Sequence, residues 1–330
     1  MRQGGVFPMN RPQRHHILPI FYLAGFTDTG TRKGRIHVFD YFRNARYHSN
    51  PNQVANEREF YRIYERGYHP YVVERDLAQL ENELAPVLYR VVETGIFHGG
   101  EELGTILSLV ALLHARGRKA RDRLSMSVQQ TMTKKIKAGE VTREQWETML
   151  AAEVRAGVDA SSRPPFEELQ GLIERGEWKP KAPEVLKVGL IPEMQQIIFD
   201  AIADRTWSLA RATLTSGGFI CSDTPLAWSD LPPGHPNASK SRLDDPNITV
   251  TFPLSKELAL ITRDDGRRET YQATDEVVAW VNSRTHLFSL GTLYSASENF
   301  LLLRAGNEIG HSSDYFSYVQ RARSEGIENP

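Results

Sequence analysis

Apolar residues recur at three- and four-residue steps in several long stretches of the chain, which is the spacing of one helical face. The strongest run begins at Val72 and continues through Leu88 and Val91 to Gly95, a residue suited to ending a helix. Pro86 lies inside this run and is expected to kink it. The same spacing predicts helices over 20–26, 72–94, 101–116, 192–214, 274–288 and 297–303, and a further one that begins at Thr142.

Shorter segments alternate apolar and polar residues or carry brief apolar runs, as strands do. They lie at 35–40, 219–221, 248–252 and 258–261. Strands therefore occur near both ends of the chain, and helices dominate its middle. This order predicts an α+β fold with a predominantly helical block and a small mixed or antiparallel sheet built from N-terminal and C-terminal segments.

Prolines and glycines suggest how the chain is divided. Residues 1–14 hold two glycines, two prolines and scattered charge, and are expected to form an extended arm. The remainder, 15–330, is expected to form a single α+β domain. The proline-rich interval 163–183 is the candidate hinge between a helical block and the C-terminal part with strands and helices.

Composition narrows the class of protein. The chain of 330 residues has 40 basic and 41 acidic side chains, so no overall field attracts nucleic acid or an anionic membrane. Cys221 is the only cysteine, which excludes an intrachain disulfide. No apolar run approaches the roughly 20 residues that span a bilayer, and no signal peptide is apparent. We expect a soluble cytoplasmic protein without membrane association, and the oligomeric state stays open.

The interval 116–137 is the one locally basic part of the chain. A solvated helix face explains it, and so does a surface that contacts nucleic acid or another anionic substrate. Asp122 is the single acidic residue among its charged side chains. The basic residues are Arg116, Arg118, Lys119, Arg121, Arg123, Lys134, Lys135 and Lys137.

His16 directly precedes the apolar segment that Pro19 opens as the first residue of a short helix. An imidazole titrates near neutrality, so His16 is a candidate general base or metal ligand. The alternative is that it bonds backbone groups at the start of the helix. Its neighbour His15 is expected to be structural or exposed.

Asp223 follows a short apolar strand and lies in the segment Ser222-Asp223-Thr224-Pro225. A carboxylate there is able to orient His16, bind a metal or exchange a proton. The alternative is a local turn in which Asp223 bonds nearby backbone N–H groups and Pro225 fixes the geometry. Ser222 is a weaker candidate because no glycine-flanked elbow surrounds it.

Other polar residues are candidates for holding substrate. Glu57 and Arg58 offer a carboxylate and an anion clamp, or an ordinary structural pair. Asn282 lies among apolar residues and is expected either to bond core groups or to contact substrate. Glu74 and Glu81, seven residues apart, are expected to be solvated or salt-bridged.

The stretch His16-Ile17-Leu18-Pro19, together with Glu57-Arg58-Glu59-Phe60-Tyr61, the 222–225 segment, Phe252-Pro253-Leu254-Ser255 and Asn282, resembles the family catalogued as domain of unknown function 4238. A histidine, two residues and a proline near the N-terminus mark that family. The resemblance extends from His15 to about Glu298. It implies an N-terminal histidine of interest and no particular reaction.

Two functional hypotheses follow. The first is a hydrolase, specifically a phosphodiesterase or nuclease, in which His16 and Asp223 react and Glu57, Arg58, Ser222 and Asn282 position substrate. A divalent metal is compatible with these residues, although they do not make a defined site. The second is a non-enzymatic binding or interaction protein, such as a component of a microbial defence or stress system, in which His16 determines the fold.

Overall fold

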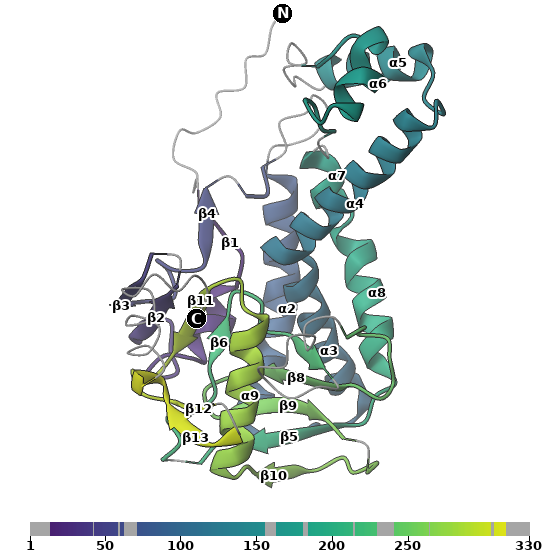
Figure 1. The fold of residues 1–330 in the computed structure, drawn as a ribbon. Helices are drawn as coiled ribbons and strands as arrows, with labels where there is room; N and C mark the ends of the chain where they lie inside the picture. Colours follow the sequence, from purple (N-terminus) through teal and green to yellow (C-terminus); the bar gives the residue numbers. More distant parts are fainter. Residues whose placement is uncertain are drawn as a thin grey trace, which may run out of the picture.

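The computed structural model describes residues 14–41, 43–58, 60–62, 71–155, 163–180, 184–213, 215–229, 241–263, 265–304 and 307–314. The predicted arm, 1–14, lies outside this part of the chain except for Arg14. The described chain has an α+β fold, as predicted, with a helical block beside two main sheets (Figure 1).

The larger sheet has five strands. Its order is β10 (Thr270–Gln272), β5 (Trp207–Arg211), β9 (Leu258–Thr262), β8 (Thr249–Pro253) and β7 (Ala227–Ser229). The β10–β5 pair is parallel and the other neighbours are antiparallel, so the sheet is mixed. Strands β8 and β9 confirm the two predicted from apolar runs.

A second sheet of four strands joins the two ends of the chain. Its order is β3 (Ala45–Ser49), β2 (Ile36–Asp40), β11 (Thr292–Ser295) and β6 (Cys221–Ser222), all antiparallel. The pairing of β2 with β11 confirms that N-terminal and C-terminal segments build a sheet together. Two-stranded ribbons are formed by β1 (Arg14–His16) with β4 (Asn56–Arg58), and by β12 (Leu301–Leu303) with β13 (Ile309–His311).

The helices confirm most of the predicted periodicity. Helix α2 continues through Pro86 and ends at Gly95, whose φ is 71°. At the start of α5, Thr142 and Gln145 exchange side-chain to backbone hydrogen bonds of 2.9 and 3.2 Å, which is a capping box. The helices are α1 (Ile20–Ala24), α2 (Val72–Thr94), α3 (Gly100–Ala115), α4 (Arg118–Lys137), α5 (Arg143–Arg155), α6 (Phe166–Glu174), α7 (Glu184–Gly189), α8 (Ile191–Ala203) and α9 (Asp275–Phe288).

Two predicted helical segments are wrong. The helix predicted over 192–214 ends at Ala203, and Trp207–Arg211 forms β5 between β9 and β10. The helix predicted over 297–303 is replaced by β12 at its end. Both errors have one physical reason: short apolar runs satisfy a helix and a fully buried strand equally well, and only pairing partners decide between them.

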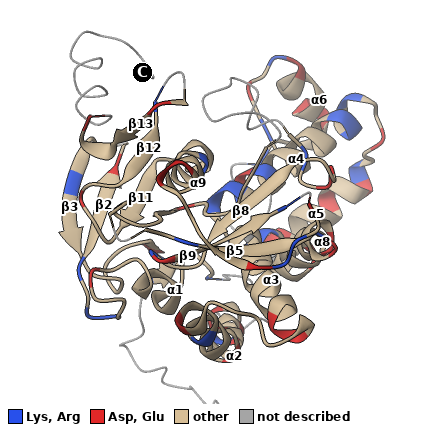
Figure 2. Cartoon of the chain, turned by 90° about the horizontal axis from the view of Figure 1, so that it is seen from below, with Lys and Arg blue, Asp and Glu red and all other residues tan. Residues whose placement is uncertain are grey.

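The main core lies between the sheets and helices α2, α3 and α8. Nearly every residue of the last three turns of α3 is buried, since α8 packs along it and α2 lies beside it. Figure 2 shows that β5, β8 and β9 carry few charged residues, whereas more of the charged residues lie on the helices around them.

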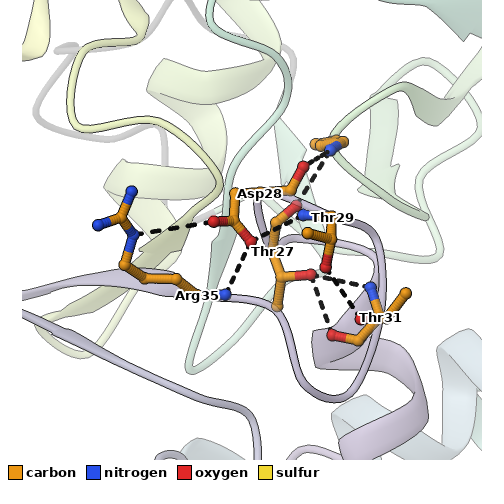
Figure 3. A network of polar contacts seen from close by, with 6 residues as sticks. Thr27, Asp28, Thr29, Thr31 and Arg35 are labelled. Atoms are coloured by element: carbon orange, nitrogen blue, oxygen red, sulfur yellow. Dashed lines mark hydrogen bonds and ion pairs between the residues drawn. The ribbon is translucent and has the colours of Figure 1, made fainter.

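A polar turn after α1 anchors the N-terminal segment to the sheet (Figure 3). Oδ1 of Asp28 accepts hydrogen bonds from the backbone N–H groups of Thr29 and Arg35, both at 2.8 Å. Nζ of Lys256 donates to the carbonyl oxygens of Thr27 and Asp28 at 3.1 and 2.6 Å. This turn is therefore closed by its own side chains and bound to the loop between β8 and β9.

Helices α5 and α6 lie at the far end of α4, away from the sheets (Figure 1). They enclose a small separate core of Ile136, Trp146, Leu169 and Ile173. The hinge at 163–183 stays a prediction, and its residues 181–183 lie outside the described chain.

Candidate functional site

A polar cavity of about 660 Å³ lies where the β1–β4 ribbon meets the four-stranded sheet and the start of α4. We call it the arginine pocket, because four guanidinium groups line it. Asp223 and Glu57, two residues chosen from the sequence, line it as well. The arginines are Arg14, Arg43, Arg58 and Arg118.

Asp223 is held at the wall of this pocket by the turn before β11. Its Oδ1 accepts from the N–H of Leu290 at 2.7 Å, and its Oδ2 accepts from the N–H of Thr292 at 3.1 Å. These two donors lie 67 and 69 residues away in the chain, so the bonds are not those of the local turn considered from the sequence. Burial raises the pKa of Asp223 to about 6, although both backbone N–H groups and the cations of Arg118 and Lys119 act in the opposite direction.

Arg118 is fixed toward the pocket by an ion pair with Glu57. Arg43 lies 3.7 Å from the Asp40 carboxylate, whereas Arg14 and Arg58 have no ion pair among the residues that the structure describes. Two of the four guanidinium groups therefore have no carboxylate partner among the described residues. An arginine without such a partner favours a carboxylate or phosphate ligand.

Tyr294 of β11 was missed by the sequence reasoning. It lines the arginine pocket, and its hydroxyl has a pKa raised well above 10, first by burial and then by the Asp223 carboxylate. The signal that would have found it is the run Thr292-Leu293-Tyr294-Ser295, which has strand propensity and forms β11. The phenol is a neutral hydrogen-bond donor at the pH where Asp223 titrates.

His16 lines a different cavity, of about 280 Å³, which we call the histidine pocket. Glu74 and Glu81 of α2 line the same cavity. Burial lowers the pKa of His16, opposed by the backbone of Asn52 and the Glu81 carboxylate. Nε2 of His16 is buried and has no hydrogen-bond partner among the described residues. The structure thus places His16 and Asp223 in separate cavities.

His15, the neighbour of His16, is fixed inside the protein. Its Nδ1 accepts from the N–H of Tyr61 at 2.8 Å, and its ring stacks on the Tyr61 ring at a centroid distance of 5.8 Å. Nε2 lies 3.4 Å from Oε2 of Glu74. The accepting Nδ1 places the proton of the neutral imidazole on Nε2, facing that carboxylate.

With the site described, comparison with known families becomes informative. Residues 14–299 match the family described as protein of unknown function, DUF4238. The chain belongs to the DUF4238 family. The match covers both cavities of this DUF4238 protein, from Arg14 at the rim of the arginine pocket to Tyr294. Neither the curated proteins nor the solved structures gave a match.

Two other residues chosen from the sequence are bonded within the core of the DUF4238 fold. The amide of Asn282 accepts from the N–H of Ile220 and donates to the carbonyl oxygens of Gly218 and Leu301, each at 3.0 Å. Oγ of Ser222 is buried and accepts from the N–H of Thr224 at 3.2 Å. Neither residue lines the arginine pocket or the histidine pocket.

The basic interval 116–137 separates into two parts with different surroundings. Arg116 is fully buried, Arg118 pairs with Glu57, and Nζ of Lys119 donates to the carbonyl oxygen of Phe288 at 3.2 Å. Arg121 donates to the carbonyl oxygen of Phe60. The exposed residues Lys134, Lys135 and Lys137 lie in the last turn of α4, where they complement the helix dipole.

Within the described part of the chain, no cluster of three or more His, Cys, Asp and Glu side chains is arranged to hold a metal ion. None of the helices it contains is both long and apolar enough to cross a bilayer.

Proposed function

We propose that this DUF4238 protein is a hydrolase of anionic esters, with phosphodiesters as the substrate class, and that the arginine pocket is its active site. The observation that supports this most strongly is the Asp223 carboxyl, with a pKa of about 6, on the wall of a cavity lined by four arginines. A carboxyl of that pKa changes protonation near neutral pH, as general acid–base catalysis requires.

The proposed reaction is hydrolysis by water. Ionised Asp223 accepts a proton from a water molecule as its oxygen attacks phosphorus, and the P–O bond to the leaving alcohol breaks. The leaving oxygen takes a proton from solvent. Among the described residues, each Asp223 oxygen accepts from one backbone N–H, so a lone pair remains for this water.

The arginines are proposed to hold the phosphate. Arg14 and Arg58 contribute the unneutralised guanidinium groups, and Arg118 is oriented by Glu57. Planar guanidinium groups bind phosphate oxygens in pairs and stabilise the charge that develops on them. His16 has no step in this proposal, because it lines the histidine pocket.

The test is turnover of bis-p-nitrophenyl phosphate by the purified protein, beside the monoester p-nitrophenyl phosphate and the neutral ester p-nitrophenyl acetate. We expect the diester to be cleaved and Asp223→Asn to lower kcat by about 100-fold or more. Asp76→Asn, an exposed carboxylate on α2, is the matched control and is expected to be fully active. A diester that is cleaved equally by Asp223→Asn and the unchanged protein contradicts the proposal.

A non-enzymatic anion-binding protein is the second candidate. The observation that favours it is that both Asp223 oxygens already bond backbone N–H groups and that Arg118 already has a carboxylate partner. Under this alternative, pyrophosphate binds the arginine pocket and Arg58→Ala weakens it, but none of the three esters is hydrolysed. A role in a microbial defence or stress system belongs to this candidate.

A further inference from the structure

A third cavity, of about 910 Å³, lies between the C-terminal part of α3, α4, α8, β7 and residues 241–244. We call it the Trp228 pocket. It shares no lining residue with the arginine pocket or the histidine pocket, so it is separate from the site of the proposed function. Its lining includes His114, Arg123, Ile197, Ile198, Trp228 and Leu243.

The walls of the Trp228 pocket are largely apolar. Trp228 is 4% exposed, and its indole Nε1 donates to the carbonyl oxygen of Ser241 at 2.8 Å, which fixes the ring. Ile197, on the opening, is 68% exposed, an unusual state for an isoleucine. A cavity of this size with a fixed aromatic ring and largely apolar walls, bordered by polar side chains, has the form of a small-molecule site.

His114 gives this cavity a polar group that the protein does not satisfy. The side chain is 8% exposed, and its Nδ1 has no hydrogen-bond partner among the described residues. The ring lies 5.3 Å from the Trp228 ring, centroid to centroid. A buried nitrogen without a partner is unfavourable, and a ligand that hydrogen-bonds to it relieves that cost.

Arg123 is the group of the Trp228 pocket that suits an acidic ligand. Two basic and two acidic side chains line this pocket. Arg242 is paired with Asp244 at 2.6 Å, whereas Asp200 accepts from Nε2 of the neutral Gln196 amide at 2.7 Å and has no ion pair among the described residues. Arg123 makes no ion pair within the described ranges and borders the cavity. It is therefore the cation there that described neighbours leave unneutralised.

We propose that the Trp228 pocket binds a small aromatic anion, such as an aryl carboxylate or sulfonate. The aromatic body packs between Trp228 and Ile197, and the acid group pairs with Arg123. A polar atom of the ligand hydrogen-bonds to Nδ1 of His114. This binding site is additional to the ester chemistry proposed for the arginine pocket.

The test uses 8-anilinonaphthalene-1-sulfonate as an anionic probe and N-phenyl-1-naphthylamine as a neutral one, each titrated into the full chain by fluorescence. We expect saturable binding of one sulfonate per chain. Ile197→Glu should weaken both probes at least about tenfold, since a carboxylate at the opening repels the anion and disrupts the apolar wall. Arg123→Ala should weaken the sulfonate about tenfold and the amine less than twofold.

Val154→Glu on α5 is the matched control, because Val154 is 60% exposed and lies outside this cavity. It should bind both probes as the unchanged chain does. Equal sulfonate affinity in Ile197→Glu and the unchanged chain overturns the proposal, as does an equal loss of both probes in Arg123→Ala. Hydrolysis of bis-p-nitrophenyl phosphate should be the same in Ile197→Glu, so failure here is distinguishable from failure of the proposed function.

Discussion

Nη1 of Arg116 lies 2.7 Å from Oε1 of Glu81, and the guanidinium is completely buried while 27% of the carboxylate side chain is exposed. The same guanidinium donates through Nε to the carbonyl oxygen of Ile17 at 2.8 Å and through Nη2 to that of His16 at 3.3 Å. One side chain therefore ties helix α2 to the backbone of the segment that precedes Pro19. That segment forms walls of both the histidine pocket and the arginine pocket.

Glu81→Ala is expected to destabilise the protein by about 2 kcal/mol, because it leaves the buried Arg116 cation without its carboxylate. The partial exposure of Glu81 keeps the loss below that of a fully buried pair. Urea unfolding monitored by circular dichroism measures it. Glu177→Ala, which breaks an exposed pair with Arg175, is the control and should leave the midpoint unchanged. Equal midpoints for both variants would show that the Arg116 pair contributes nothing.

Asn282→Leu is expected to cost about 3 kcal/mol or more, because it leaves the N–H of Ile220 and two carbonyl oxygens buried without partners. Thermal unfolding is the measurement. Gln196→Ala, which removes an exposed amide from α8, should change the melting temperature little. A folded Asn282→Leu variant of normal stability but weakened substrate binding would favour the alternative role, substrate contact.

The pH dependence of diester hydrolysis should follow Asp223. With a pKa of about 6 and the ionised carboxylate as base, kcat/KM should rise about tenfold per pH unit below 6 and level off above it. Initial rates between pH 4.5 and 8 measure the profile. Arg58→Ala should raise KM and leave this inflection in place, since its guanidinium is proposed to bind substrate and takes no part in the proton transfer. A profile without an inflection between pH 5 and 7 would remove Asp223 as the base.

Stability should fall in acid partly through His114. Burial lowers its pKa from 6.5 to about 3, so between these values the unfolded chain binds a proton that the folded chain does not. The contribution is fully present above pH 6.5 and is lost as pH falls, by about 2 kcal/mol at pH 5. Urea midpoints for His114→Gln should therefore depend less on pH than those of the unchanged chain.

His311→Gln, which removes an exposed imidazole, is the control for that comparison and should keep the original pH dependence. Parallel pH dependence in His114→Gln and the unchanged chain would mean that His114 binds a proton equally well in both states. Asp223 contributes with the opposite sign, because its raised pKa makes the folded chain bind the extra proton below about pH 6. The contribution of His114 is therefore measured as the difference in pH dependence between His114→Gln and the unchanged chain.

The fold was predictable where the local pattern of apolar residues fitted only one type of secondary structure. The long periodic runs gave α2, α3 and α9, and the paired apolar segments gave β8 and β9. The runs 207–211 and 300–303 each had two solutions, and only their pairing partners decided between them. The partners of 207–211 lie far away in sequence, whereas the partner of 301–303 is the next strand of the chain. β5 pairs with β9 and β10, and β12 pairs with β13.

The sequence was enough to predict which side chains suit the chemistry of a site. It was not enough to predict which of them share a cavity. Asp223, Glu57 and Arg58 were chosen because their side chains suit proton transfer and anion binding, and the structure brings them to one cavity with Arg118. His16 was chosen on the same grounds and lies in another cavity. Arg116 gave no local signal of burial, since a basic residue at the end of an apolar helix is usually solvated.

The sequence by itself determined the α+β class, the positions of the longest helices and the side chains able to exchange protons or bind anions, because periodicity and functional groups are local properties. Only the tertiary structure decided which of those groups share a cavity, which cation is buried, and that Asp223 has a pKa near 6. Pairing between distant strands and exclusion of water set these properties, and neither is encoded in any single stretch of the chain.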